Sequence, residues 1–327
     1  MAPFIGALLY CETTTLETDV EKNKVQAFFY ELWKTKTLLF MILPFVIHLI
    51  IFKYIPIWGW IMAFQDYKPQ LGIMGSQFVG LKHFKALLTD PLFKLVLRNT
   101  LSISLIKLTL GTICAVTLAL LLNETKNKYF KSITQTITSL PHFLSWVVTA
   151  SLIKEMLSID GGMVNNILMF LHVIKEPVLW LSIEKYFWWI MGWSSVWKEV
   201  GWGAIIYLAA MTSIDEQLYE AAKIDGAGRI QRIIHVTLPG IKSTFVILLI
   251  MDIGYMMSAG YEQMFLLQNG LVQDVSQVFE TFAIKYGLGK GRYSFAAASG
   301  IFQSVVSIVL ITIANKLSNA IGEDGLF

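Results

Sequence analysis

The sequence predicts an all-α protein that crosses a membrane six times, and two observations carry this prediction. Hydrophobic residues make up 55% of the chain and charged residues only 15%, whereas a soluble domain has about 25% charged residues. Several apolar runs also reach the length of about 20 residues that a helix needs to span a bilayer. These runs lack strict alternation of polar and apolar residues, which favours helices over a barrel.

Six apolar runs make up the predicted membrane domain, residues 37–318. In chain order they are Thr37–Trp60, Asn99–Leu122, Ser132–Leu157, Phe187–Met211, Thr244–Leu267 and Phe295–Ser318. An even number of spans places both chain ends on one side of the membrane. The lysines and arginines of the loops are nearly balanced between the two sides, so the positive-inside rule favours a cytoplasmic N-terminus only slightly.

Short tails flank the membrane domain at residues 1–36 and 319–327. The N-terminal tail has apolar residues at helical spacing with lysines between them, which predicts an amphipathic helix on the membrane surface. It has no basic segment at its start, so we expect no cleaved signal peptide. The two cysteines, Cys11 and Cys114, provide no disulfide framework.

The connection between the fourth and fifth runs, residues 212–243, is predicted to form two short helices. They break at Gly226-Ala227-Gly228, because glycine permits a sharp bend. Short apolar stripes at helical spacing on both sides of the break indicate an element that docks on a partner. The alternative is that the two amphipathic helices lie on the lipid surface.

A spaced motif in this connection resembles the EAA loop of ABC importer permeases. Glu220-Ala221-Ala222 is followed after three residues by Gly226, and after nine more by Val236-Thr237-Leu238-Pro239; only Val236 departs from the family's isoleucine. The resemblance implies a type I ABC importer permease fold and a cytoplasmic coupling helix that docks on an ATP-binding subunit. It assigns this coupling role to Glu220, Ala221, Ala222, Asp225, Gly226, Ala227, Leu238 and Pro239.

Three further stretches resemble sugar permeases, the latter two the narrower LplB-type branch: Gln77–Phe84, Trp197–Trp202 and Tyr261–Phe265. The resemblance implies an oligosaccharide substrate, with an acidic one as a possibility. It also implies a second homologous permease, two ATP-binding subunits and an extracellular solute-binding protein as partners. The setting would be the bacterial inner membrane, with both termini in the cytoplasm.

Sequence signatures of an enzyme are missing. Gly289-Lys290 is followed by Gly291 rather than the Ser or Thr of a phosphate-binding loop. The five histidines are scattered, without metal-ligand spacing. We therefore expect no catalytic residue, no metal site and no cofactor in this chain, with ATP and Mg bound by partner subunits; no nucleic-acid partner is expected.

Three charged residues lie inside predicted spans: Lys107, Glu199 and Asp252. A charge at mid-membrane costs several kcal/mol unless it faces a cavity or a partner, so such residues are candidates for function. Lys198 or Lys107 would favour an anionic sugar, although each could instead pair with a carboxylate of the chain. Helical spacing would place Asp252, Tyr255, Ala259 and Glu262 on one face of the fifth span.

Polar and aromatic side chains together suit a sugar, which needs hydrogen bonds to hydroxyls and apolar contact with rings. The predicted substrate path comprises Trp193, Trp197, Glu199, Asp252, Tyr255 and Gln303. The alternative is that the tryptophans form an interfacial belt and the polar residues join helices.

The sequence therefore predicts the membrane subunit of an ATP-driven importer of oligosaccharides. A permease of the same class for a non-sugar solute remains an alternative, because the coupling loop does not specify the substrate. A membrane-embedded enzyme is a third reading, which would require an acid-base pair near one membrane face; the sequence shows none.

Overall fold

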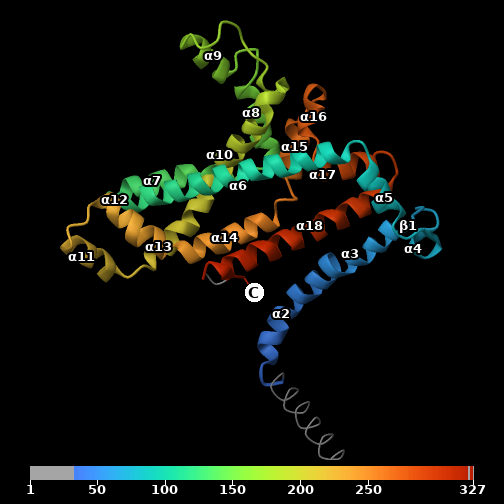
Figure 1. The fold of residues 1–327 in the computed structure, drawn as a ribbon, viewed down its shortest axis with the longest axis horizontal. Helices are drawn as coiled ribbons and strands as arrows, with labels where there is room; N and C mark the ends of the chain where they lie inside the picture. The colour runs from blue at the N-terminus through green and yellow to red at the C-terminus, as the bar shows by residue number, and fades with distance from the viewer. Residues whose placement is uncertain (1–32, 323–324, 327) are drawn as a thin grey trace, which may run out of the picture. The chain divides into compact units, whose positions relative to one another are not determined.

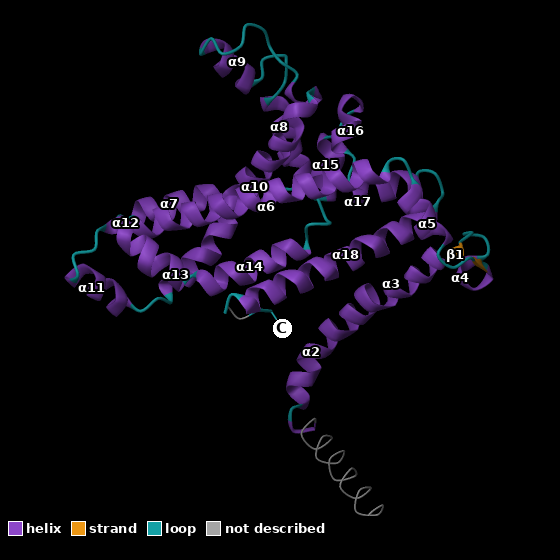
Figure 2. Cartoon of the chain, in the orientation of Figure 1, coloured by secondary structure: helices purple, strands orange, loops and turns teal. Residues whose placement is uncertain are grey.

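The computed structural model describes residues 33–322 and 325–326, and helices form most of this part of the chain (Figure 1). Its only strands are one short pair (Figure 2). The prediction of an all-α protein is confirmed. The amphipathic helix predicted in the N-terminal tail lies outside the described residues, apart from the last few residues of that tail.

The chain divides into two compact units, residues 1–60 and 61–327. In the first unit, α2 (Lys36–Leu49) continues through a π-helical turn at Ile50–Tyr54 into α3 (Ile55–Ile57). The helical run extends to Phe64, and its apolar stretch has a mean hydropathy of 2.3 with none of it buried within the chain. This run corresponds to the first predicted span.

The second unit begins with a small hairpin and a short helix. Strands β1 (Gln65–Asp66) and β2 (Gln77–Phe78) are antiparallel, and α4 (Gly72–Gly75) lies between them in the chain. Helix α5 (Lys82–Thr89) follows and packs on α18 (Tyr293–Ala320). The buried aromatic core beneath α5 comes from α6, α17 and α18, with residues Phe93, Phe279, Phe282 and Phe295.

Two long helices, α6 (Phe93–Glu124) and α10 (Glu184–Thr212), pack along each other and form the centre of the unit (Figure 1). Small residues of α10 allow this close approach. A Cβ atom on Gly192 would lie 2.6 Å from Ile106 Cγ2, and one on Gly203 would lie 3.3 Å from Ala115 Cβ. Small residues serve this purpose where membrane helices meet.

The third predicted span is bent rather than straight. Helix α7 (Lys128–Ser139) and a 3₁₀ turn at Leu140–Phe143 meet α8 (Trp146–Met156) at an angle of 104°. Pro141 lies in the turn and has no backbone N–H to continue the helix. Ser145 then starts α8 by accepting a hydrogen bond from Val148 N. The prediction of one continuous helix over Ser132–Leu157 is therefore wrong.

A lobe follows α8, with α9 (Met163–Phe170) and a 3₁₀ turn at Trp180–Ser182. Asn165 is fully buried and holds the lobe together. Its Nδ2 donates to the carbonyls of Ser158 and Val178, and its Oδ1 accepts from Val178 N and Trp180 Nε1.

The fourth connection contains α11 (Glu216–Ile224), α12 (Arg229–Arg232), a π-helical turn at Ile233–Thr237 and α13 (Leu238–Gly240). The break between α11 and α12 falls at residues 225–228, where Gly226 has a φ of +79°. The two predicted helices and their glycine break are confirmed. Helix α14 (Lys242–Gly254) follows α13 at an angle of 60°.

The fifth predicted span also differs from a continuous helix. α14 ends at Gly254, residues 255–260 are not helical, and α15 (Tyr261–Leu267) begins after Gly260, whose φ is +88°. Lys107 Nζ donates to Ala259 O in this break. Asp252 and Glu262 therefore do not share one helical face, contrary to the prediction.

The chain continues through a 3₁₀ turn (Gly270–Val272), α16 (Gln273–Ser276), α17 (Phe279–Ala283) and a π-helical turn (Ile284–Leu288) to α18. Within the part of the chain that the structure describes, three helical runs qualify as membrane spans by length and composition: Lys36–Phe64, Phe93–Glu124 and Tyr293–Ala320. The two bent pairs raise this number to five. α10 has 29 residues but a charged pair in its middle, and it is not among them. The count of six stays a prediction.

Candidate functional site

A cavity of about 340 Å³ lies at the centre of the second unit. Its walls come from α6, from α10, and from the last turns of α14 with the non-helical residues after it. Lys107, Gly111 and Ala115 of α6 are four residues apart and share one helical face. Glu199, Gly203 and Tyr207 do the same on α10, so the two facing helices line the cavity with mixed polar and small side chains.

Three of the predicted substrate-path residues line this cavity: Glu199, Asp252 and Tyr255. The other three do not. Trp193 and Trp197 are about half exposed and lie outside it. Gln303 lies on α18, where its Nε2 donates to Ser299 O at 3.4 Å.

Helical geometry explains why Trp193 and Trp197 do not line the cavity. Trp197 and Glu199 are two residues apart, and positions two apart on a helix point in nearly opposite directions. Once Glu199 faces the cavity, Trp197 faces away from it, and Trp193 lies one turn before Trp197 on the same outer side. Their place in the predicted path is therefore not supported by the structure.

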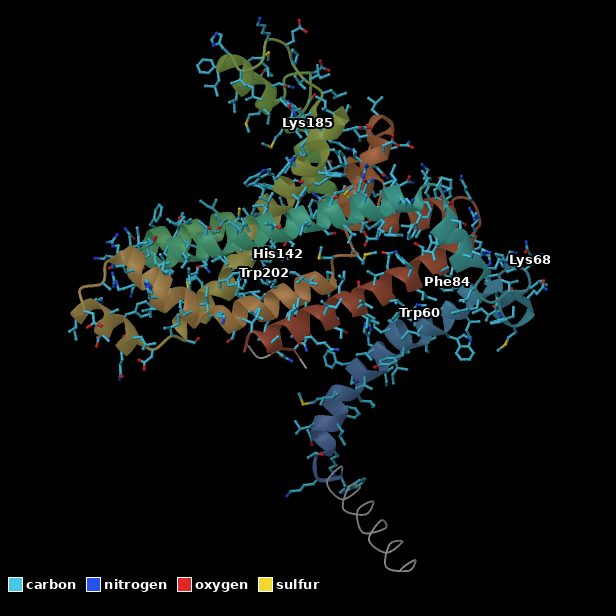
Figure 3. All side chains as sticks on the ribbon, viewed as in Figure 1. Trp60, Lys68, Phe84, His142, Lys185 and Trp202 are labelled. Carbon is cyan, nitrogen blue, oxygen red and sulfur yellow. The ribbon has the colours of Figure 1, made fainter. Side chains whose placement is uncertain are left out.

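Trp202 at the cavity and His142 stacked on it are two aromatic groups that the sequence analysis does not single out. Trp202 lines the cavity, and the His142 ring stacks on it with centroids 4.6 Å apart and planes 4° apart (Figure 3). His142 Nδ1 lies 2.6 Å from Glu199 Oε2. Trp202 is three residues after Glu199, and this helical spacing is a usable signal. His142 comes from the bend after α7, and no spacing in the sequence relates it to Glu199.

Lys107 and Lys198 donate hydrogen bonds to backbone carbonyls. The Lys198 side chain is only 6% exposed, and its Nζ donates to the carbonyls of His142 at 2.7 Å and Leu144 at 2.8 Å. It also lies 3.6 Å from Glu199 Oε1. Lys107 donates to Ala259 O as described above. Lys198 therefore stabilises the bend between α7 and α8, whereas Lys107 additionally lines the cavity.

The cavity offers several groups that form hydrogen bonds. Two carboxylates and one ammonium line it, together with hydroxyls and an indole. These polar lining residues are Ser104, Lys107, Thr112, Ser195, Glu199, Trp202, Tyr207, Asp252, Tyr255 and Ser258. Within the described part of the chain, Ser104 Oγ is buried without a hydrogen-bond partner. Such a lining suits a ligand with many hydroxyls and an apolar ring face.

The coupling loop, residues 215–240, is a second candidate site at the far end of α10. Asp215 caps α11 by accepting from Gln217 N at 2.9 Å. Tyr219 Oη and Thr237 Oγ1 lie 3.0 Å apart and join the two arms across the glycine break. No residue of α11 is buried, so this helix extends beyond the rest of the unit.

Large apolar side chains of the loop are exposed: Leu218 by 55%, Ile224 by 87% and Ile230 by 71%. An exposed apolar surface of this kind marks a contact with a partner or with lipid. Most of the predicted coupling residues are exposed as well, while Ala222 and Ala227 are half-buried. The exposed ones are Glu220, Ala221, Asp225, Gly226, Leu238 and Pro239.

Among residues 33–322 and 325–326, no group of three metal-ligating side chains lies close enough to hold a metal ion.

Comparison with known proteins places these features in context. The sequence pattern of the family described as "Binding-protein-dependent transport system inner membrane component" matches residues 107–321. The polygalacturonan/rhamnogalacturonan transport system permease protein YteP of Bacillus subtilis (strain 168) is 43% identical over 326 residues, which cover 100% of this chain and 98% of the relative. Protein LplB of the same strain is 40% identical over 294 residues, covering 90% and 92%.

Two solved structures are also similar. A chain in the crystal structure of a bacterial ABC transporter involved in the import of the acidic polysaccharide alginate has a TM-score of 0.81 and 36% identity. The alignment covers 90% of this chain and 98% of that one. A crystal structure of the alginate transporter with a periplasmic protein bound to alginate pentasaccharide gives a TM-score of 0.82 at the same identity and coverage.

Proposed function

Because the chain belongs to the family of binding-protein-dependent transport system inner membrane components, we propose that an acidic oligosaccharide crosses the membrane through it. The chain is a permease subunit of an ABC importer and has no enzymatic activity of its own. It is a multi-pass membrane protein. The central cavity between α6, α10 and residues 252–258 is the part of the translocation path that this subunit contributes.

The single observation that carries the proposal is the chemistry of this cavity. Carboxylates, an ammonium, hydroxyls and an indole line one hollow inside a helical membrane protein. Pure hydrocarbon solutes would leave these polar groups unpaired, whereas a saccharide satisfies them. The names of the relatives support an acidic sugar: one is a polygalacturonan/rhamnogalacturonan permease and another belongs to an alginate importer.

Partners complete the importer in this proposal. A second homologous permease closes the other side of the path, and an extracellular solute-binding protein delivers the oligosaccharide. Two ATP-binding subunits bind ATP and Mg, and one of them receives the exposed loop at residues 215–240. The membrane is the bacterial inner membrane, with both termini in the cytoplasm and lipid around the apolar helices.

The coupling loop supports the ATP-driven mechanism but does not indicate which substrate is transported. A permease for a non-sugar solute would use the same loop, so the substrate has to be tested directly. The assembled complex is reconstituted in vesicles with its binding protein, and uptake is compared among a uronate oligosaccharide, a neutral oligosaccharide of equal length, phosphate and amino acids. Uptake of phosphate or amino acids in place of both saccharides would overturn the sugar assignment.

Tyr255→Ala tests whether the cavity is the path. Tyr255 is 69% exposed and lines the cavity, so its loss removes a ring and a hydroxyl from the wall without disturbing a packed core. We expect uptake to slow about tenfold, as the loss of roughly 1 to 1.5 kcal/mol of contact implies, with normal assembly. Tyr129→Ala is the matched control, since Tyr129 is 84% exposed and lies outside the cavity. Equal effects of the two variants would contradict the assignment.

A further inference from the structure

A second cavity, also of about 340 Å³, lies in the segment between α15 and the π-helical turn before α18. It is at the end of α10 opposite the coupling loop. Trp188, in the first turns of α10, donates from Nε1 to Val275 O at 2.8 Å, and Asn269 Nδ2 donates to Leu181 O at 2.9 Å. Figure 1 shows α15 and α16 far along the molecule from α11.

The lining of this cavity differs from that of the central one. It contains the amides Gln268, Gln273 and Gln277 and the hydroxyl of Ser276. Lys285 is the single charged side chain in the lining, which includes no carboxylate. Asn269, Thr281 and two apolar groups, Phe265 and Ile284, complete the wall. The cavity therefore combines amide groups, one positive charge and one aromatic ring.

Several of these polar groups form no side-chain hydrogen bond with any residue that the structure describes. Ser276 is 1% exposed, and its Oγ has no hydrogen-bond partner among the described residues. Among the described residues, the side-chain amides of Gln268, Gln273 and Gln277 likewise form no hydrogen bond. A buried hydroxyl without a partner is unfavourable, so this cavity has hydrogen-bonding capacity that a ligand would satisfy.

The backbone that forms the cavity is held in place by α6. Asn99 is fully buried, and its Nδ2 donates to the carbonyls of Asp274 and Gln277 at 3.0 and 3.1 Å. Thr100 Oγ1 accepts from Phe279 N at 3.2 Å. These contacts fix α16 and the start of α17, so the lining groups are already positioned before a ligand arrives.

We propose that this cavity is a second saccharide-binding site, selective for a sugar unit that carries a carboxylate. Amides donate to and accept from neighbouring hydroxyls, Lys285 pairs with the carboxylate, and Phe265, which is 52% exposed, covers the apolar face of the ring. The inference rests on the proposed function. It places an acid-selective contact on the side away from the coupling loop, ahead of the central cavity.

Calorimetric titration of the full reconstituted complex, without binding protein, tests this site. The titrants are a uronate trisaccharide and a neutral trisaccharide. We expect Lys285→Gln to weaken uronate binding about tenfold, the effect of losing one charge-assisted hydrogen bond, and to leave neutral binding unchanged. Gln273→Leu should weaken both titrants. Lys175→Gln is the control, because Lys175 is exposed and lies outside both cavities.

Each contrary result has a distinct meaning. If wild-type complex imports oligosaccharides but Lys285→Gln binds uronate as tightly as Lys175→Gln does, the second site is refuted and the proposed function stands. If wild-type complex neither binds nor imports any oligosaccharide, the proposed function itself fails. If Lys285→Gln weakens docking of the empty binding protein and leaves trisaccharide binding unchanged, the cavity is a protein contact and the site is refuted.

Discussion

At the scale of single residues, Lys198 shows how a charge deep in a membrane helix is accommodated. The sequence of the bend leaves carbonyls without helical partners, because Pro141 and the turn after it interrupt the ladder. Lys198 Nζ donates to two of these carbonyls, and Glu199 lies beside it. A cation at the end of a helix also interacts favourably with the helix dipole.

Lys198→Met should therefore destabilise the subunit rather than change its substrate. Removing the ammonium leaves buried carbonyls unpaired, at a cost of about 1 to 3 kcal/mol each. We expect a lower thermal unfolding midpoint of the assembled complex and reduced assembly. Lys154→Met is the control, since Lys154 is exposed at the end of α8. Normal stability combined with a lost preference for acidic cargo would instead make Lys198 a substrate ligand.

Part of the candidate site was predictable from single residues. The cost of a charge in lipid singles out Glu199 and Asp252, and the structure places both around one cavity with Tyr255. The aromatic rings of Trp193 and Trp197 suit a sugar, but Trp197 lies two residues before Glu199 and so faces nearly the opposite side of α10. His142 reaches Glu199 only because the chain turns by 104° after α7, which is a tertiary property.

At the scale of elements, the coupling loop depends on one backbone conformation. Gly226 has a φ of +79°, and a Cβ atom there would meet nothing within 4 Å. A side chain at this position is therefore disfavoured by backbone strain alone, not by a clash. Gly228 has a φ of −68°, which any residue adopts.

Gly226→Val should disrupt the proposed coupling between this permease and the ATP-binding subunits. The strain, of order 1 to 3 kcal/mol, disfavours the turn that orients α11 against α12. We expect the reconstituted complex to lose substrate-stimulated ATPase activity and uptake together, while the permease still assembles. Gly228→Ala is the matched control and should behave as wild type. Full stimulated activity in Gly226→Val would contradict the coupling role of this loop.

The β1–α5 corner adds a pH-dependent contact outside the membrane spans. Lys82 Nζ lies 2.7 Å from Asp66 Oδ2, and His83 Nε2 lies 3.2 Å from Oδ1. The hydrogen bond from Lys82 lowers the pKa of Asp66 below its ordinary value of 3.8. A lowered pKa in the folded state means that the contact stabilises the protein above that ordinary value and is lost as the pH falls through the lowered one.

Asp66→Asn should therefore reduce stability at neutral pH and have no effect in strong acid. We expect the difference in unfolding midpoint between wild type and variant to be small, because the pair is partly exposed. This difference should vanish as the pH drops below the lowered pKa of Asp66. Asp160→Asn, at an exposed position, serves as control. A difference that persists unchanged in acid would show that the pair is not responsible.

The elements themselves were only partly predictable. Long apolar runs gave α6, α10 and α18 close to their observed bounds, because length and composition determine a straight span. The bent pair at α7 and α8 and the break after Gly254 were missed. Both lie within apolar sequence, and their carbonyls are satisfied by lysines of other helices, Lys198 and Lys107. Hydropathy carries no information about such distant partners.

At the scale of the whole molecule, the exposed surface is that of a subunit surrounded by lipid and partners. The apolar stretches of α6 and α18 are only 17% and 11% buried within the chain. Hydrophobic burial inside the chain therefore accounts for little of these helices' environment, and lipid or a second permease provides the rest.

The last prediction concerns the side of the membrane that each end of α10 faces. α10 runs from the lobe at residues 158–183 to the coupling loop, so the lobe and the loop lie at opposite ends of one 29-residue helix, which is about 43 Å long. The predicted six spans and the proposed cytoplasmic position of the loop would place the lobe outside. In the connection before α18, Lys290 is exposed and is therefore a suitable position for chemical labelling. Gly287, in the same connection, is buried against Ala296 and is not.

Single cysteines at Asp160, Lys290 and Asp225 decide this topology, in a chain whose two native cysteines are replaced by serine. All three positions are exposed, so access depends on the side of the membrane rather than on burial. We expect an impermeant maleimide added to intact cells to label the first two positions and to leave the Asp225 position unlabelled until the membrane is opened. Labelling at Asp225 in intact cells, without labelling at Asp160, would place the coupling loop outside. An ATP-binding partner in the cytoplasm could not reach it there, so the proposed energy coupling would fail together with the topology.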